Sequence, residues 1–343
     1  MTSSTTVRQA KGPAGSRPVR TVAVTWLRLG RVLAVVALGL GLAAPVLAVA
    51  DPPAGAVVRP HLFEVGYRML GADGGVFAFD APFVGSGASD PTTCPPQVVT
   101  RALPDGTCSS MATTPDDRGY WILNAYTGAV TPYGDAVSYG DRTASNTGST
   151  EFWPTSVAIV PTVTGHGYWI LDVGLNGLGS VLAFGDAVSY GDESTATPLV
   201  AHAGTPVAMA ATTDGLGYWI VDSDGGVFAF GDAVFLGSMG GLPLVAGVVG
   251  IARTPDGGGY WLAAADGGVF AFGDARFGGS MAGTALAAPV TSIVAEPYGG
   301  GYWLAAADGG VFALGGAPVL GSMAGTSLAA PVIAIGAPEG SPV

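Results

Sequence analysis

The last quarter of the chain contains one stretch of sequence twice, in nearly identical form. GGGYWLAAADGGVFAFGDARFGGSMAGTALAAPV begins at Gly257, and GGGYWLAAADGGVFALGGAPVLGSMAGTSLAAPV begins at Gly299. More diverged copies are marked by a Gly-Tyr pair that recurs every 42 to 53 residues. The tyrosines of these pairs are Tyr67, Tyr120, Tyr168, Tyr218, Tyr260 and Tyr302. A period of this length is typical of repeat proteins whose units bury their faces against one another, so six units constrain the fold strongly.

Each unit is expected to form a small antiparallel sheet. In the unit around Tyr260, three strands are expected at 248–252, 260–265 and 269–272. A turn at 254–257 separates the first two, and Asp266-Gly267-Gly268 suits the tight hairpin before the third. Residues 276–279 predict a short fourth strand, weakened by glycine as is common at an outer edge.

Four short strands in 42 residues match one propeller blade. Phe270 and Phe272 share one face of the third strand and Val269 and Ala271 the other, so large side chains can pack on small ones of the next sheet. The tryptophans that repeat at one position are expected to fill the core between blades. They are Trp121, Trp169, Trp219, Trp261 and Trp303, with Arg68 in the first unit. We therefore predict an all-β, six-bladed β-propeller, rather than an open solenoid or separate β-domains.

The end of the chain predicts how the ring closes. Residues 330–336 begin a seventh unit that never reaches its Tyr-Trp pair. We expect a strand at 331–336 to complete the first blade by pairing near 66–71, although 57–63 could compete for that place.

The first 50 residues predict export. They contain six basic residues, no acidic residue, and an apolar run at 32–50 that ends in Ala48-Val49-Ala50. This pattern is typical of a signal peptide cleaved after Ala50, and a retained N-terminal anchor is the alternative. Either interpretation leaves 51–343 as a single propeller that is secreted or held in the extracytoplasmic cell envelope.

The charge of residues 51–343 limits the partners. This part has seven Arg, no Lys and all 25 acidic residues, a net charge of about −18. Such a surface repels phosphate backbones and anionic lipid. We expect no nucleic-acid partner and no membrane contact beyond the leader.

Cys94 and Cys108 lie in the longest insertion, 87–111, with thirteen residues between them. In an oxidising compartment the expected outcome is a disulfide that staples this loop, with two free thiols as the alternative. Without an adjacent histidine the pair makes a poor metal site.

The run GYWLAAADGGVFAFGDA, with the variants GYWIVDSDGGVFAFGDA from Gly217 and GYRMLGADGGVFAFDAP from Gly66, resembles a repeat of exported proteins of high-GC Gram-positive bacteria. The resemblance covers nearly all of 51–343. It implies a β-propeller-like array, often beside cell-wall or hydrolase modules, and it transfers no catalytic residue. The Tyr-Trp pairs are also similar to those of six-bladed YWTD propellers of receptors, but the Thr-Asp half is missing here, so no receptor role is inferred.

Two sets of aspartates recur with the repeat. One set precedes the hairpin glycines (Asp73, Asp224, Asp266 and Asp308), and the other follows a strand (Asp135, Asp186, Asp232 and Asp274). A ring of cation-binding carboxylates is one interpretation, but turn formation and capping of backbone amides are favoured. Residues 222–225 resemble the start of a calcium loop but lack its later acidic ligands. We predict no metal and no cofactor.

Templates for catalysis are absent from the sequence. His61, His166 and His202 lie in no nucleophile motif, and no Gly-x-Ser-x-Gly elbow or zinc signature is present. A glycan-active hydrolase would need two carboxylates that face each other across a pocket.

The insertions carry the candidate binding residues, because loops of repeat folds vary with function. The candidates are Arg101 in 87–111, and Arg142, Asn146, Glu151, Phe152 and Trp153 in 141–154. The Phe-Trp pair suits stacking on sugar rings; alternatively, it begins the first strand of the third unit and packs inward. We expect an exported, non-catalytic binding or interaction module with a glycan or protein ligand, and a glycan-active hydrolase is the alternative.

Overall fold

The computed structural model describes residues 66–89, 93–94, 108–145, 155–195 and 203–338. The chain divides into two compact units, Met1–Arg59 and Pro60–Val343. The predicted leader, 1–50, therefore lies outside the described residues.

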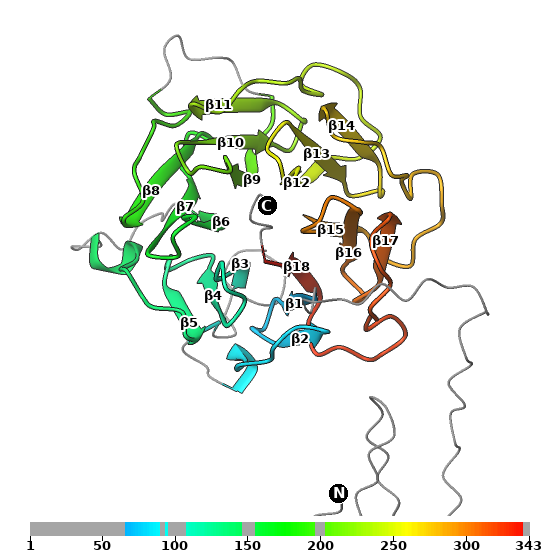
Figure 1. Ribbon diagram of the computed structural model, residues 1–343, viewed down its shortest axis with the longest axis horizontal. Helices are drawn as coiled ribbons and strands as arrows, with labels where there is room; N and C mark the ends of the chain where they lie inside the picture. The colour runs from blue at the N-terminus through cyan, green and yellow to red at the C-terminus, as the bar shows by residue number, and fades with distance from the viewer. Residues whose placement is uncertain (1–65, 90–92, 95–107, 146–154, 196–202, 339–343) are drawn as a thin grey trace, which may run out of the picture. The chain divides into compact units, whose positions relative to one another are not determined.

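The described residues form 18 strands in six three-stranded antiparallel sheets, with only two short 3-10 turns, Gly87–Ser89 and Arg142–Ser145 (Figure 1). The inner strands are β18 (Val332–Gly336), β3 (Cys108–Thr113), β6 (Thr155–Pro161), β9 (Pro206–Ala211), β12 (Val248–Arg253) and β15 (Val290–Ala295). The middle strands are β1 (Tyr67–Gly71), β4 (Gly119–Asn124), β7 (Gly167–Val173), β10 (Gly217–Asp222), β13 (Gly259–Ala264) and β16 (Gly301–Ala306). The outer strands are β2 (Val76–Phe79), β5 (Val130–Gly134), β8 (Gly179–Gly185), β11 (Val227–Gly231), β14 (Val269–Gly273) and β17 (Val311–Gly315). We number the sheets from the first, β18-β1-β2, to the sixth, β15-β16-β17.

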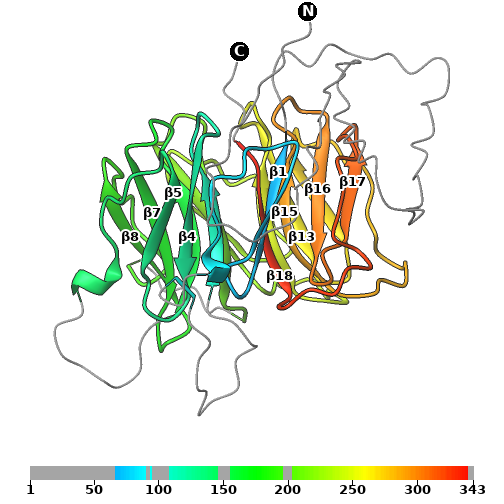
Figure 2. The ribbon, with the colours of Figure 1, turned by 90° about the horizontal axis from the view of Figure 1, so that it is seen from below.

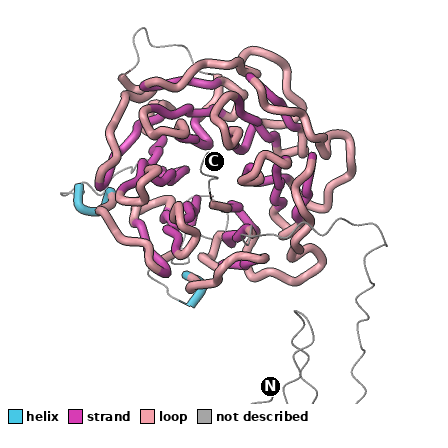
Figure 3. The backbone as a smooth tube through the Cα atoms, viewed as in Figure 1, coloured by secondary structure: helices cyan, strands magenta, loops and turns pink. Residues whose placement is uncertain are grey.

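The six sheets have a propeller-like arrangement. Inner strands of successive sheets contact one another, and β15 of the sixth sheet also contacts β18 of the first. Figure 3 shows the strands grouped around a common centre, with long loops leading from β11 to β12, from β14 to β15 and from β17 to β18. The prediction of an all-β fold built from six repeated sheets is thus confirmed.

The C-terminal strand completes the first sheet, as predicted. β18 pairs antiparallel with β1, so that Arg68 lies opposite Gly336 and Met69 opposite Ile335. Figure 2 shows β18, in red, beside β1, in blue. The competing segment, 57–63, lies outside the described residues.

The prediction of a fourth strand in each sheet, at 276–279 in the fifth, is wrong. Residues 276–279 form no strand, and the sheets have three strands each. Gly279 has φ +120, which turns the chain away from β14. The segment instead bonds to the sixth sheet, because the Gly278 N–H donates to the Tyr302 hydroxyl (3.1 Å) and Gly315 N–H donates to the Gly278 carbonyl (2.9 Å).

Aromatic residues fill the space between neighbouring sheets, as predicted for the repeated tryptophans. Their exposed fractions are 3% or less, and each ring centroid lies 5.1–5.8 Å from a tyrosine ring of the following sheet. The pairs are Trp121–Tyr168, Trp169–Tyr218, Trp219–Tyr260, Trp261–Tyr302 and Trp303–Tyr67. The last pair links the sixth sheet to the first, so the same aromatic packing occurs between these two sheets as between the others.

Candidate functional site

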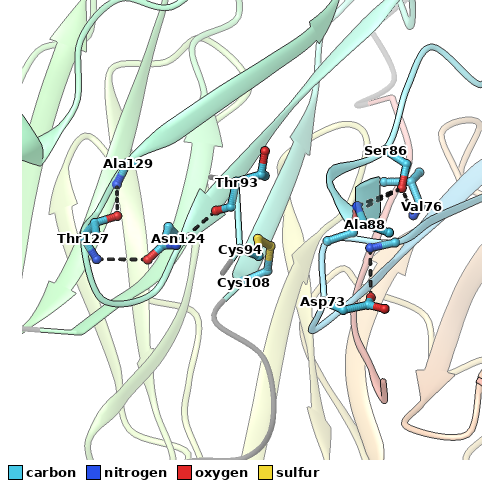
Figure 4. The surroundings of a disulfide bond; sticks show 12 residues. Asp73, Val76, Ser86, Ala88, Thr93, Cys94, Cys108, Asn124, Thr127 and Ala129 are labelled. Carbon is cyan, nitrogen blue, oxygen red and sulfur yellow. Dashed lines mark hydrogen bonds between the residues drawn. A yellow bond between two sulfur atoms is a disulfide. The ribbon is translucent and has the colours of Figure 1, made fainter. Parts of the chain in front are cut away.

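The predicted disulfide between Cys94 and Cys108 is present, with the two Cα atoms 5.3 Å apart (Figure 4). Both cysteines are buried beside Leu70 and Tyr120, between the first and second sheets. Cys108 is the first residue of β3, so the insertion predicted at 87–111 ends before it and residues 108–111 belong to a strand. The disulfide therefore ties the loop to an inner strand, and it is compatible with an extracytoplasmic location.

The start of the same loop is held by a second contact. The Asn124 side-chain amide donates to the Thr93 carbonyl at 3.0 Å (Figure 4). Asn124 ends β4, so the residue before Cys94 is attached to the middle strand of the second sheet.

Most of the predicted ligand-binding residues lie outside the described residues. These are Arg101, Asn146, Glu151, Phe152 and Trp153, and their role stays a prediction.

Arg142 is described, and its side chain is directed into the protein. It is 4% exposed, and its Nη1 lies 3.2 Å from Oδ2 of Asp172 in β7. Its Nη2 donates to the Tyr126 carbonyl, and the Ser156 hydroxyl donates to the other Asp172 oxygen at 2.5 Å. Burial raises the pKa of Asp172, whereas the Ser156 hydrogen bond and the Arg142 charge lower it. Arg142, Asp172 and Ser156 thus form a polar contact between the second and third sheets.

The hairpin aspartates act in turns, as predicted. In each, Oδ1 accepts the N–H two residues later at 2.9 Å. Threonine hydroxyls donate hydrogen bonds to three of the strand-end aspartates. Thr162 (2.8 Å) and Thr164 (2.5 Å) donate to Asp186, Thr212 donates to Asp232 (3.2 Å), and Thr254 donates to Asp274 (3.5 Å). Within the described residues, no three His, Cys, Asp or Glu side chains gather into a group that could hold a metal ion.

A central cavity of about 270 Å³ is lined by all six inner strands. Its lining residues are mostly small or apolar, and those with hydroxyls are Ser109, Ser110, Thr113, Thr291 and Ser292. The described residues that line it include no charged side chain.

A second cavity of about 420 Å³ has a different character. It lies where the fifth and sixth sheets meet, and we name it the Tyr298 groove. Its lining residues are Thr254, Pro255, Asp256, Trp261, Asp274, Arg276, Tyr298 and Gly299. It combines an exposed aromatic ring, two carboxylates and a guanidinium, which are the elements of a polar ligand site.

Two turns and one strand end position these side chains. Tyr298 lies in the turn between β15 and β16, where its N–H donates to Glu296 Oε2 at 3.1 Å, and its side chain is 58% exposed. Arg276 follows β14, and its carbonyl accepts the Trp261 indole N–H at 2.9 Å. The backbone at both positions is therefore fixed, while both side chains are exposed.

The two carboxylates of the groove share one hydrogen-bond donor. The Thr254 hydroxyl donates to Asp274 at 3.5 Å and also, together with the Gly258 N–H, lowers the pKa of Asp256. Asp256 therefore carries its negative charge at neutral pH. Equivalent pairs occur at Asp116 with Asp135 and at Asp214 with Asp232. The pair is thus a property of the repeat, whereas Tyr298 and Arg276 are particular to this groove.

Sequence reasoning missed Tyr298 and Arg276, although a signal was present. The near-identical repeats 257–290 and 299–332 differ at six of 34 positions, and five of these lie in 272–278. Arg276 and Asp274 are among them. Because the differences between the two copies gather in 272–278, this segment is where the surface of the fifth sheet differs from that of the sixth.

A search of protein-family models and of curated proteins finds no match to this chain. None of the helices in the described part of the chain is long and apolar enough to cross a bilayer.

Proposed function

We propose that residues 51–343 form a closed six-bladed β-propeller that is exported and acts as a non-catalytic binding module at the cell envelope. The pairing of β18 with β1 supports closure, as does the Trp303–Tyr67 contact. The disulfide, the acidic charge and the basic, then apolar, first 50 residues support export. The ligand class is a glycan or a protein.

The single observation that carries a binding role is the Tyr298 groove. It is the place in the described structure where an exposed aromatic, carboxylates and a guanidinium line one cavity. Sites for small ligands have this composition, since a few polar groups orient the ligand and an aromatic surface supplies contact area.

The shared hydrogen-bond donor of the groove carboxylates favours binding over hydrolysis. Glycoside hydrolases hold their two carboxyl groups about 5 to 9.5 Å apart, so that a sugar and, in inverting enzymes, a water fit between them. Asp256 and Asp274 instead share the hydroxyl of Thr254 as a hydrogen-bond donor, and Asp214 and Asp232 share that of Thr212 in the same way. A pair that recurs with the repeat is not by itself evidence of catalysis.

Two experiments test this function. N-terminal sequencing of the exported protein is expected to find a mature end at Asp51, and retention of the leader would favour the anchor. The full chain is then applied to a glycan array and to isolated cell envelopes, and each glycan that binds is assayed for cleavage. Binding without cleavage supports the module. Cleavage that is lost in Asp256→Asn or Asp274→Asn would replace it with the hydrolase.

A further inference from the structure

We propose that the Tyr298 groove binds a neutral pyranose oligosaccharide, with one sugar ring on the Tyr298 side chain and its hydroxyls bonded by Arg276, Asp256 and Asp274. This inference rests on the proposed binding function and assigns it a site and a ligand class.

Tyr298 departs from the repeat in a way that folding does not require. The same turn position holds a small polar residue in the four preceding units: Asp116, Thr164, Asp214 and Asp256. In three of these the aspartate takes part in the turn and the carboxylate pair. Tyr298 cannot serve that purpose, and 58% of its side chain is left exposed. An exposed aromatic ring at the edge of a polar cavity is suited to stacking on the C–H face of a sugar.

Arg276 departs from the repeat in a similar way. Its carbonyl accepts the Trp261 indole N–H, and the residues that serve Trp121, Trp169, Trp219 and Trp303 in this manner are Val137, Val188, Val234 and Pro318. The backbone contact is thus independent of the side chain. The ion pairs among the described residues do not include Arg276, although Asp256 and Asp274 line the same groove. Its guanidinium is therefore available to a ligand.

The chemistry of the groove selects the ligand. Carboxylates accept hydrogen bonds from sugar hydroxyls, and a guanidinium donates two parallel hydrogen bonds to neighbouring oxygens. Two carboxylates and a chain of net charge near −18 disfavour an anionic glycan. The volume of about 420 Å³ lies in the range of about 300–1,000 Å³ that holds small-molecule ligands.

The position of the groove within the duplicated sequence supports the assignment. In the last unit, the residues that match Asp274 and Arg276 are Gly316 and Pro318. The segment after β17 therefore lacks both of the charged side chains that follow β14. The full set of side chains occurs once, at the junction of the fifth and sixth sheets, in the described structure.

Isothermal titration of the full chain with defined probes tests the proposal. The neutral probes are cellotetraose, maltotetraose and chitotetraose, and the charged comparators are tetragalacturonate and tetralysine. We expect at least one neutral tetrasaccharide to bind. Tyr298→Ala should weaken that binding about tenfold and Tyr298→Phe should preserve it, because the ring supplies the contact. Arg276→Gln should weaken it about tenfold, since a charge-assisted hydrogen bond is lost.

Matched variants control for effects on the fold. Phe277→Ala removes an equally exposed aromatic (62%) that does not line the groove, and Asp232→Asn changes the residue that matches Asp274 in the fourth sheet. Both should bind the neutral probe as the wild type does. All variants should melt within a few degrees of the wild type, because every changed residue is exposed.

The failure of the site and the failure of the function are distinguishable. A neutral tetrasaccharide that binds Tyr298→Ala and Arg276→Gln with wild-type affinity would overturn the groove and leave the binding function in place. Binding of tetragalacturonate or tetralysine alone would overturn the neutral ligand class. If none of the five probes binds, the inference is wrong, and the array and envelope experiments then decide the proposed function separately.

Discussion

Arg68 and Asp117 form an ion pair that joins the first sheet to the second, with 2.5 Å between Nη1 and Oδ1. Arg68 is fully buried and occupies the position that tryptophan holds in the other five sheets. Its Nε donates to the Pro82 carbonyl at 2.8 Å, as each indole N–H donates to the matching carbonyl. Asp117 holds a left-handed conformation (φ 61) at a position where the later turns have glycine: Gly165, Gly215, Gly257 and Gly299. Where the other sheets have tryptophan and the following turn has glycine, the first sheet has Arg68 and the turn of the second sheet has Asp117.

This exchange predicts strong coupling between the two positions. Arg68→Ala should lower the free energy of unfolding by about 3 kcal/mol, because it leaves a cavity beside Tyr120 and removes the partner of Asp117. The double variant Arg68→Trp with Asp117→Gly restores the arrangement of the other sheets and should recover most of that loss. Urea unfolding followed by tryptophan fluorescence measures both. A double variant no more stable than Arg68→Ala would contradict the inference that Arg68 and Asp117 take the places of the tryptophan and glycine of the other sheets.

A second exchange predicts a similar result at Arg142. The residues that match Arg142 in the last three units are Met239, Met281 and Met323, and each of the four N–H groups donates to the carbonyl of a hairpin glycine. Asp172 is matched by Ala264 and Ala306 in the last two sheets. Arg142→Met alone should cost about 3–5 kcal/mol of stability, because it leaves Asp172 buried without its partner.

The matched control for that variant removes the carboxylate as well. Arg142→Met with Asp172→Ala should be clearly more stable than Arg142→Met, since the matching Met281 already packs against the hydrophobic cluster between the fifth and sixth sheets. The coupling energy of the double-mutant cycle, obtained from urea unfolding, should exceed about 1 kcal/mol. Additive effects would show that the ion pair does not link the two residues energetically.

The disulfide predicts a redox-dependent stability. Cys94→Ala with Cys108→Ala should lower the free energy of unfolding by about 3 kcal/mol, as expected when a loop of this length is no longer closed. Reduction of the wild type with dithiothreitol should lower it by a similar amount, while the double variant should be insensitive to the reagent. Wild-type stability in the double variant would show that the loop is held by other contacts, such as that between Thr93 and Asn124.

The sequence predicted most of the features that repeat, and the Cys94–Cys108 disulfide, but it missed the polar side-chain contacts that join different units. The six sheets, the closing strand and the tryptophan core follow from a period, because an inference made at one unit is supported by the others. The fourth strand at 276–279 was wrong because glycine at Gly279 allows a positive φ that alternation of side chains does not reveal. Arg142 was expected in an open loop, and its burial depends on Asp172, 30 residues away. The groove combines Arg276 and Tyr298 from different units, and a unit-by-unit analysis treats them separately.

Six buried tyrosines make alkaline pH a test of the packing between sheets. Burial raises the pKa of Tyr67, Tyr120, Tyr168, Tyr218, Tyr260 and Tyr302, that of Tyr67 from 10.0 to about 12. Each hydroxyl donates to a glycine carbonyl of the preceding sheet, a bond that requires the proton.

The sign of the effect follows from proton linkage. Because the folded state holds these protons more tightly than the unfolded chain, their contribution to stability is complete below pH 10 and is lost as pH rises above 10, for Tyr67 through about 12. Tyrosinate absorbance and the loss of the β-sheet circular dichroism signal should therefore rise together in this range. Tyr302→Phe keeps the ring and removes one titrating group, so the free energy of unfolding should fall less steeply with pH. Formation of tyrosinate at all eleven tyrosines near pH 10 in a folded protein would contradict the burial of these six hydroxyls between the sheets.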